Sequence, residues 1–166
     1  MLITEQTKYA DIAHVEKYLT EKAVSELYKA AEAKFGSMYD LTFAQFHACA
    51  NGYFSEIVGD MENPTVLQIY WCKRFGEFVK DFAETLSKIT LMQTPDEKRA
   101  CTGLLKTDWA EGLLVFIRDY FGLSSFKAAE NITLGEVLIA KRARYNDDLF
   151  RRNLARIQTQ KIKSKK

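Results

Sequence analysis

A four-residue pattern, Thr-x-x-Glu or Thr-x-x-Gln, recurs along this chain and divides it into helical segments. In such a capping box the threonine oxygen accepts a hydrogen bond from the backbone N–H three residues on, and the Glu or Gln side chain reaches back to the threonine's own N–H. Each box therefore predicts the start of a helix. At Thr94 the pattern is strengthened by Pro95 in the first helical position, where a missing N–H costs no hydrogen bond. The boxes are Thr42–Gln45, Thr65–Gln68, Thr94–Glu97 and Thr133–Glu136.

The residues after two of these starts repeat with the period of a helix. After Thr65 and after Thr94, apolar residues recur at steps of three and four, which places them on one helix face. Both faces are wide enough to contribute to a core, and we expect them to pack against each other. The side chains expected to be largely buried are Trp71, Phe75, Phe78, Phe82, Trp109 and Phe116.

These signals predict an all-α protein, a bundle of about five or six helices with an extended basic C-terminal helix. Little or no strand is expected, because no segment alternates apolar and polar residues with a period of two. Gly36 and Gly122 are expected to end the helices that precede them. The expected helical segments span residues 7–19, 20–34, 42–58, 65–90, 95–121 and 133–158, with a short helical piece over 124–130.

Two regions are distinguished by charge. Residues 141–166 hold ten basic and two acidic side chains, a net charge of +8, so residues 1–140 carry −6 of the chain's total of +2. We assign residues 1–132 to a helical bundle domain and residues 133–166 to a C-terminal helix and basic tail, which is either part of the same domain or a docking arm. Such asymmetry favours a polyanionic or acidic protein partner for the basic segment, or folding of that segment back onto its own acidic body.

No known constellation for catalysis, cofactor binding or metal binding is present in the sequence. There is no phosphate-binding glycine loop, no nucleophile elbow and no Cys-x-x-Cys. Neither His14 nor His47 follows a glutamate at the spacing of a di-metal site, and His47 is expected to be an ordinary, partly buried helix residue. We therefore expect a protein that is not an enzyme and that uses no cofactor and no metal.

The cellular setting is predicted from what the chain carries and lacks. Three dispersed cysteines do not form a disulfide framework, which fits a reducing compartment. The N-terminal residues do not resemble a signal peptide, and no apolar run is long enough to cross a membrane. We expect a cytoplasmic protein with no membrane partner.

The basic C-terminal segment has the spacing of a helix that packs on something. Leu134, Leu138, Tyr145 and Leu149 share one helical stripe, and Phe150, Leu154 and Ile157 continue a stripe that drifts round the helix. We predict that this segment binds other proteins of an assembly, including a homo-oligomer, with its cations assisting; the alternative is nucleic-acid binding through the same cations. The predicted partner-binding residues are Tyr145, Leu149, Phe150, Arg151, Arg152, Leu154, Arg156, Lys161, Lys163, Lys165 and Lys166.

The run FGLSSFKAAENITLGEVL, from Phe121 to Leu138, resembles small helical proteins of tailed bacteriophages, notably tail assembly chaperones. In those proteins a Gly-Leu turn precedes a short helix, and an apolar-Thr-x-x-Glu-apolar start opens the next one. The resemblance implies binding to tape-measure or other tail proteins, without catalysis or cofactor. It also implies a place in the host cytoplasm and in the virion, where a structural role is the equal alternative to a chaperone role.

Overall fold

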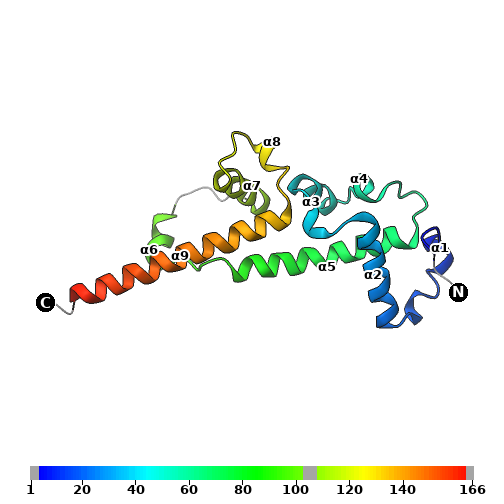
Figure 1. Cartoon of the computed structure of the whole chain (residues 1–166), viewed down its shortest axis with the longest axis horizontal. Coiled ribbons are helices and arrows are strands. Elements are labelled where there is room, and N and C mark those ends of the chain that lie inside the picture. The colour runs from blue at the N-terminus through cyan, green and yellow to red at the C-terminus, as the bar shows by residue number, and fades with distance from the viewer. Residues whose placement is uncertain (1–3, 103–107, 164–166) are drawn as a thin grey trace.

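The computed structural model describes residues 4–102 and 108–163, and within them the regular elements are all helical (Figure 1). The predicted all-α class is confirmed. The helices number somewhat more than the five or six expected, because several of them are short. In chain order the elements are α1 (Tyr9–Ile12), the 3-10 turn η1 (Glu16–Tyr18), α2 (Glu21–Phe35), the 3-10 turn η2 (Met38–Asp40), α3 (Phe43–Ala50), α4 (Ser55–Val58), α5 (Val66–Lys88), α6 (Pro95–Ala100), α7 (Trp109–Tyr120), α8 (Phe126–Ala129) and α9 (Leu134–Lys163).

All four capping boxes are formed, and each starts a helix where the sequence predicts one. The threonine N–H groups donate to the Gln or Glu side chains over 2.7–3.0 Å. In return the amides three residues on donate to the threonine oxygens over 3.2–3.4 Å. Gly36 and Gly122, at φ +94° and +63°, follow α2 and α7 as expected.

Helix starts are also joined to each other in pairs through their backbones. The N–H of Phe43 donates to Ile132 O and the N–H of Leu134 donates to Leu41 O, each over 2.9 Å, so α3 and α9 begin side by side. A second reciprocal pair, of the same length, links Tyr9 to Pro64 and Val66 to Thr7 at the starts of α1 and α5. These bonds satisfy amides that a helix cannot satisfy within its own first turn.

Three predicted helical segments are interrupted in the structure. The segment expected as 7–19 divides into the short helix α1 and the 3-10 turn η1. The segment expected as 42–58 ends at Ala50, where Gly52 N and Tyr53 N close a turn onto Cys49 O and Ala48 O, and α4 follows. The segment expected as 95–121 is wrong as one helix, since α6 ends at Ala100 and α7 starts afresh after Asp108. Asp108 and Glu111 form a fifth capping box, with Glu111 N 2.8 Å from Asp108 Oδ1.

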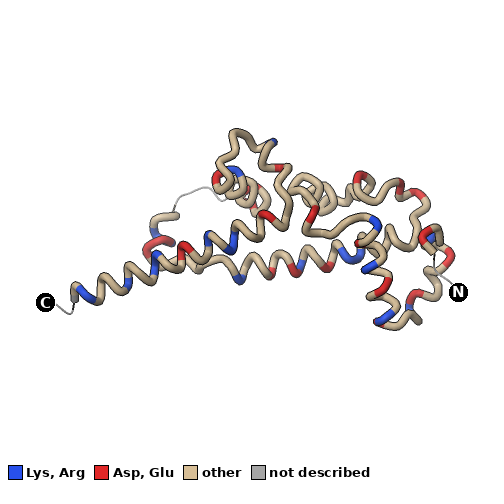
Figure 2. The backbone as a smooth tube through the Cα atoms, viewed as in Figure 1, with Lys and Arg blue, Asp and Glu red and all other residues tan. Residues whose placement is uncertain are grey.

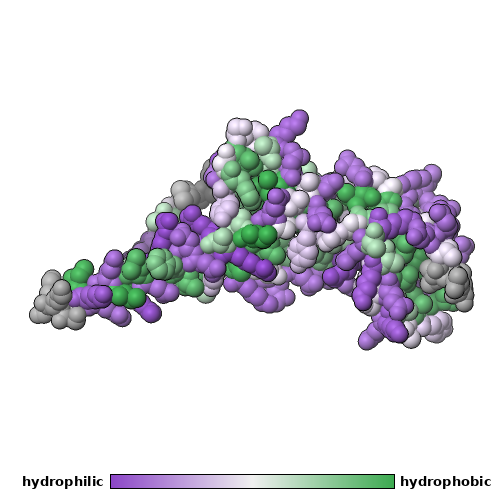
Figure 3. Space-filling model, in the orientation of Figure 1, coloured by the Kyte–Doolittle hydropathy of each residue, from purple (hydrophilic) through white to green (hydrophobic). Residues whose placement is uncertain are grey.

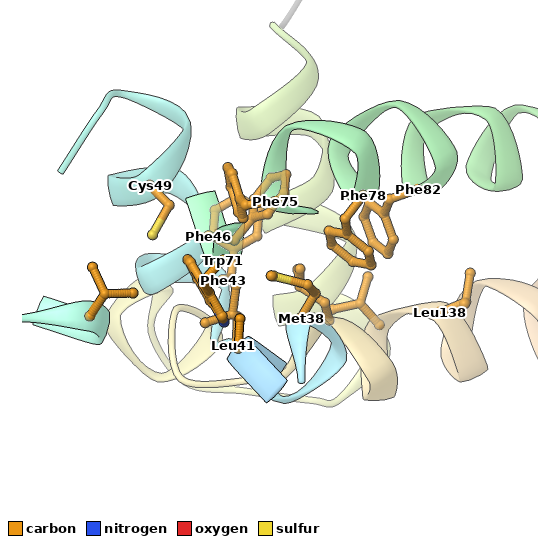
Figure 4. Close-up of a cluster of buried hydrophobic side chains, with 14 of the residues drawn as sticks. Met38, Leu41, Phe43, Phe46, Cys49, Trp71, Phe75, Phe78, Phe82 and Leu138 are labelled. Carbon is orange, nitrogen blue, oxygen red and sulfur yellow. The ribbon is translucent and has the colours of Figure 1, made fainter. Parts of the chain in front are cut away.

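The core is built around the aromatic face of α5 (Figure 4). Trp71, Phe75, Phe78 and Phe82 are buried as predicted, and the ring of Phe46 from α3 lies 5.7 Å from that of Phe75 and 5.9 Å from that of Phe82. Met38, Leu41 and Leu138 close the cluster from η2, the start of α3 and α9.

The expected burial of Trp109 and Phe116 is wrong. Trp109 is 51% exposed and Phe116 is half-buried, whereas Leu113 and Ile117 are the buried residues of α7. The physical reason is the restart at Asp108. Leu113 and Ile117 face the body, whereas Trp109 lies in the first turn of α7, where its ring is 5.9 Å from that of Phe46 and half of the side chain remains in water.

Candidate protein-binding surface on the C-terminal helix

The first third of α9 belongs to the body of the protein. Leu134, Val137 and Leu138 are buried in the same cluster as the aromatic residues of α5, and Ala140 is buried beside them. The helix also packs closely on η2. A Cβ placed on Gly135 would lie 3.3 Å from the backbone oxygen of Tyr39, so a glycine allows the two backbones to approach.

The rest of α9 leaves the body and projects from one end of the molecule (Figure 1). Large apolar side chains remain uncovered on this end, and they are visible as green patches among hydrophilic side chains in Figure 3. Phe150 is 64% exposed, Ile157 45% and Leu154 42%. On a helix that turns about 100° per residue, these three fall within roughly 60° of one another. We name Phe150, Leu154 and Ile157 the outward face.

The structure divides the predicted stripe between two sides of the helix. Tyr145 is half-buried and lines a shallow hollow with Ile89 and Phe116, so it turns toward the body. Leu149, at 36% exposed, lies near that same side. The outward face is roughly opposite, and Ile139, at 69% exposed, extends it toward the body. The spacing in the sequence identified the apolar residues but not which of them the body would cover.

One arginine of α9 is bound to the body. Arg152 donates through Nη1 to Met92 O over 2.8 Å, and through Nη2 to both carboxylate oxygens of Glu97, over 3.0 and 2.9 Å. The same carboxylate accepts from Thr94 N at the start of α6, over 2.7 Å. The hydrogen bond from Thr94 and the neighbouring guanidinium of Arg152 lower the pKa of Glu97. Folding of the basic segment onto its own acidic body, one of the two alternatives, is therefore realised at Arg152.

Figure 2 marks the positions of the basic residues along α9, and other cations among them pair within the helix itself. Arg144 Nε lies 3.1 Å from Asp148 Oδ2, and Arg151 Nε lies 3.0 Å from Asp147 Oδ2. Arg156 contacts no carboxylate in the described part of the chain, and Lys161 is exposed. Lys165 and Lys166 lie outside the described residues, as does the side chain of Lys163. Three arginines of α9, Arg144, Arg151 and Arg152, are therefore paired with carboxylates of this chain.

A basic residue of α9 that the sequence did not single out is Lys141. Its Nζ lies 3.8 Å from the centre of the Phe116 ring, and burial lowers the pKa of the amine. A cation over an aromatic face is stabilised by the ring's negative charge density. Only the relation between α7 and α9 brings the two together, so no sequence signal identifies this contact.

A groove of about 630 Å³ lies between α3 and α7. Its lining includes the small side chains of Ala44, Ala48 and Ala110 and the carboxylates of Asp108, Glu111 and Glu130. His47 stands at the edge with its Nδ1 3.5 Å from Asn51 Nδ2; it is exposed, which corrects the expectation of partial burial. The sequence did not predict this groove, because it depends on the unforeseen start of α7.

The described residues offer little to nucleophilic or metal chemistry. Burial raises the pKa of the Cys49 and Cys72 thiols to about 11, so both are protonated at neutral pH. Cys101 is exposed. Among residues 4–102 and 108–163 there is no group of three or more His, Cys, Asp or Glu side chains placed to hold a metal ion. No helix in these ranges is both long and apolar enough to span a bilayer.

Comparison of the chain with protein-family models, with curated proteins and with solved structures gave no match.

Proposed function

We propose that this chain is a non-catalytic assembly protein that binds another protein through the projecting part of α9. The observation that carries the proposal is the outward face, where three large apolar side chains stand uncovered on one side of a helix beyond the body. Isolated helices of about 12–15 residues are only marginally stable in water, and packing of an apolar face normally supplies the rest. A partner on this face would supply that packing.

The arrangement of the cations favours a protein over a nucleic acid as partner. Nucleic-acid affinity comes largely from lysines and arginines that are available to phosphates. Arg144, Arg151 and Arg152 already hold carboxylates of this chain. A partner nucleic acid would have to break those pairs, whereas a partner helix on the outward face would leave them in place. Buried aromatic and aliphatic anchors also carry most of the energy of a typical protein interface.

Within this class, we propose a component of a tailed-bacteriophage virion or of its tail or head-tail assembly. The basis is the resemblance of residues 121–138 to tail assembly chaperones. The elements that the resemblance implies occur in the expected order: a Gly122-Leu123 turn, the short helix α8 and the start of α9 at Thr133. The partner would then be a tail or head-tail protein.

The test compares two double variants in the native host. Phe150→Ala with Leu154→Ala removes anchors of the outward face, and Arg151→Ala with Arg156→Ala removes two cations without touching the contact of Arg152 with Glu97. We expect the apolar variant to lose the protein that copurifies with the chain while its helical circular dichroism stays unchanged, and the arginine variant to keep it.

The nucleic-acid alternative predicts the reverse. The arginine variant alone would lose binding, and the wild-type chain would retard DNA or RNA with an affinity that falls steeply as salt rises. Either a full loss of binding in the arginine variant or retention of the partner by the apolar variant would contradict the proposal.

A further inference from the structure

The groove between α3 and α7 is complementary to the projecting end of α9 in apolar character and charge. The small side chains of Ala44, Ala48 and Ala110 in its lining let another helix approach closely. In the described part of the chain, no lysine or arginine pairs with Asp108, Glu111 or Glu130 of the lining. The groove therefore presents apolar surface bordered by three carboxylates without a cationic partner.

The projecting end of α9 has the opposite charge. Residues 150–163 hold five basic side chains and no acidic one, and Arg151 lies beside the outward face. Asp147, next to the face, is matched by Arg151. An apolar face on a basic helix end fits an apolar groove lined by carboxylates, because the buried apolar area supplies affinity and the charges fix orientation and suppress wrong partners.

The two surfaces of one chain cannot meet. The start of α9 is tied to the start of α3 by the hydrogen bonds of Phe43 and Leu134. From Leu134 to Ile157 the helix rises by 23 residues, or about 35 Å at about 1.5 Å per residue. The outward face is therefore carried away from its own groove (Figure 1).

We propose that the end of α9 docks in the α3–α7 groove of a second copy of this chain. The inference rests on the proposed function, since it names the partner of the same outward face. Because the two surfaces differ, the contact is head-to-tail: each copy offers a face at one end and a groove at the other. Repetition of such a contact gives a ring if the rotation closes and a filament if it does not.

The experiment uses two full-length variants that each remove one half of the contact. Phe150→Asp places a charge on the outward face, and its control, Ala155→Asp, places the same charge on another side of the same helix. Ala44→Arg fills the groove, and its control, Ala50→Arg, makes the same change at an exposed position of α3 outside it. Circular dichroism verifies that each variant is folded, and sedimentation velocity measures its association.

We expect the wild-type chain and both controls to associate increasingly with concentration, and less at high salt. Phe150→Asp and Ala44→Arg should each sediment as monomers. Mixed in equal amounts, the two variants should double in molar mass and grow no further, because an intact groove on one meets an intact α9 end on the other and no further contact is left.

Four results would overturn the inference. A wild-type chain that stays monomeric at every concentration excludes a second copy as the partner of the groove, which would then bind another protein. Association of Ala44→Arg on its own, which indicates a symmetric contact of α9 with α9, or a mixture of the variants that stays monomeric, rules out the head-to-tail contact. Loss of association in a control variant places the contact elsewhere. The proposed function fails separately, if Phe150→Asp retains the copurifying protein.

Discussion

Arg152 joins the projecting helix to the body by holding both carboxylate oxygens of Glu97, 55 residues earlier in the chain. The Glu97 carboxylate connects α6 with α9, because it also accepts the hydrogen bond of Thr94 N–H at the start of α6. The segment from Met92 to Glu97 is thereby held against α9, and the outward face begins next to this contact.

Removing the guanidinium should release this segment without disturbing the core. We expect Arg152→Gln to speed amide hydrogen exchange in residues 92–100 and to leave exchange in α5 unchanged, since the contact lies on the surface. Arg151→Gln is the matched control, because the carboxylate that Arg151 pairs with among the described residues, Asp147, is on its own helix. Equal exchange in the two variants would show that the Glu97 contact does not hold the segment.

The same contact should depend on pH with a defined sign. The pKa of Glu97 is lowered in the folded chain, so its contribution is fully present above the ordinary pKa of a glutamate and is lost as the pH falls through the lowered value. An NMR titration should show the Glu97 carboxyl and the Arg152 Nη–H groups changing together, below the range of an ordinary glutamate. In Arg152→Gln the carboxyl should titrate at higher pH; an unchanged midpoint would contradict the assignment of the pair.

Gly135 and Gly76 should respond to the same substitution with opposite signs. At Gly135 an added methyl group would lie 3.3 Å from the backbone oxygen of Tyr39, so Gly135→Ala should destabilise the fold by about 1–3 kcal/mol through forced displacement of η2 from α9. Gly76 lies in mid-helix with no atom within 4 Å of the added carbon, and Gly76→Ala should stabilise by about 0.5–1 kcal/mol. Urea denaturation measures both; two changes of the same sign would refute the close approach at Gly135.

The core is tested by a pair of aromatic truncations. Phe78 is buried against the rings of Tyr39 and Phe82, so Phe78→Ala should cost about 3–5 kcal/mol of unfolding free energy. Trp109→Ala should cost clearly less, because half of that side chain is already in water. A larger loss at Trp109 than at Phe78 would contradict the burial of the two side chains described above.

These features differ in how far the sequence predicts them. The starts at Thr42, Thr65, Thr94 and Thr133 are predictable because a capping box is satisfied within four residues. The restart at Asp108 follows the same chemistry, with Asp in place of Thr, but two acids at this spacing are equally typical of a solvated helix face.

The binding surface is less predictable, for a physical reason. The apolar residues of α9 are visible in the sequence, but both sides of the helix carry them. Tertiary structure decides which side is covered. Leu134 and Leu138 are buried in the core, and Tyr145 lines the hollow beside Ile89, whereas Phe150 stays exposed. The α3–α7 groove depends in the same way on where α7 begins.

The most direct test of a protein-binding outward face is photo-cross-linking from that face in the native host. A benzophenone-bearing phenylalanine replaces Phe150, with the same group at Ala155 as the control on another side of α9. We predict a discrete protein adduct from position 150, a copy of this chain or another assembly protein, and a much weaker one from position 155. Nucleic-acid adducts, or equal adducts from the two positions, would contradict the account.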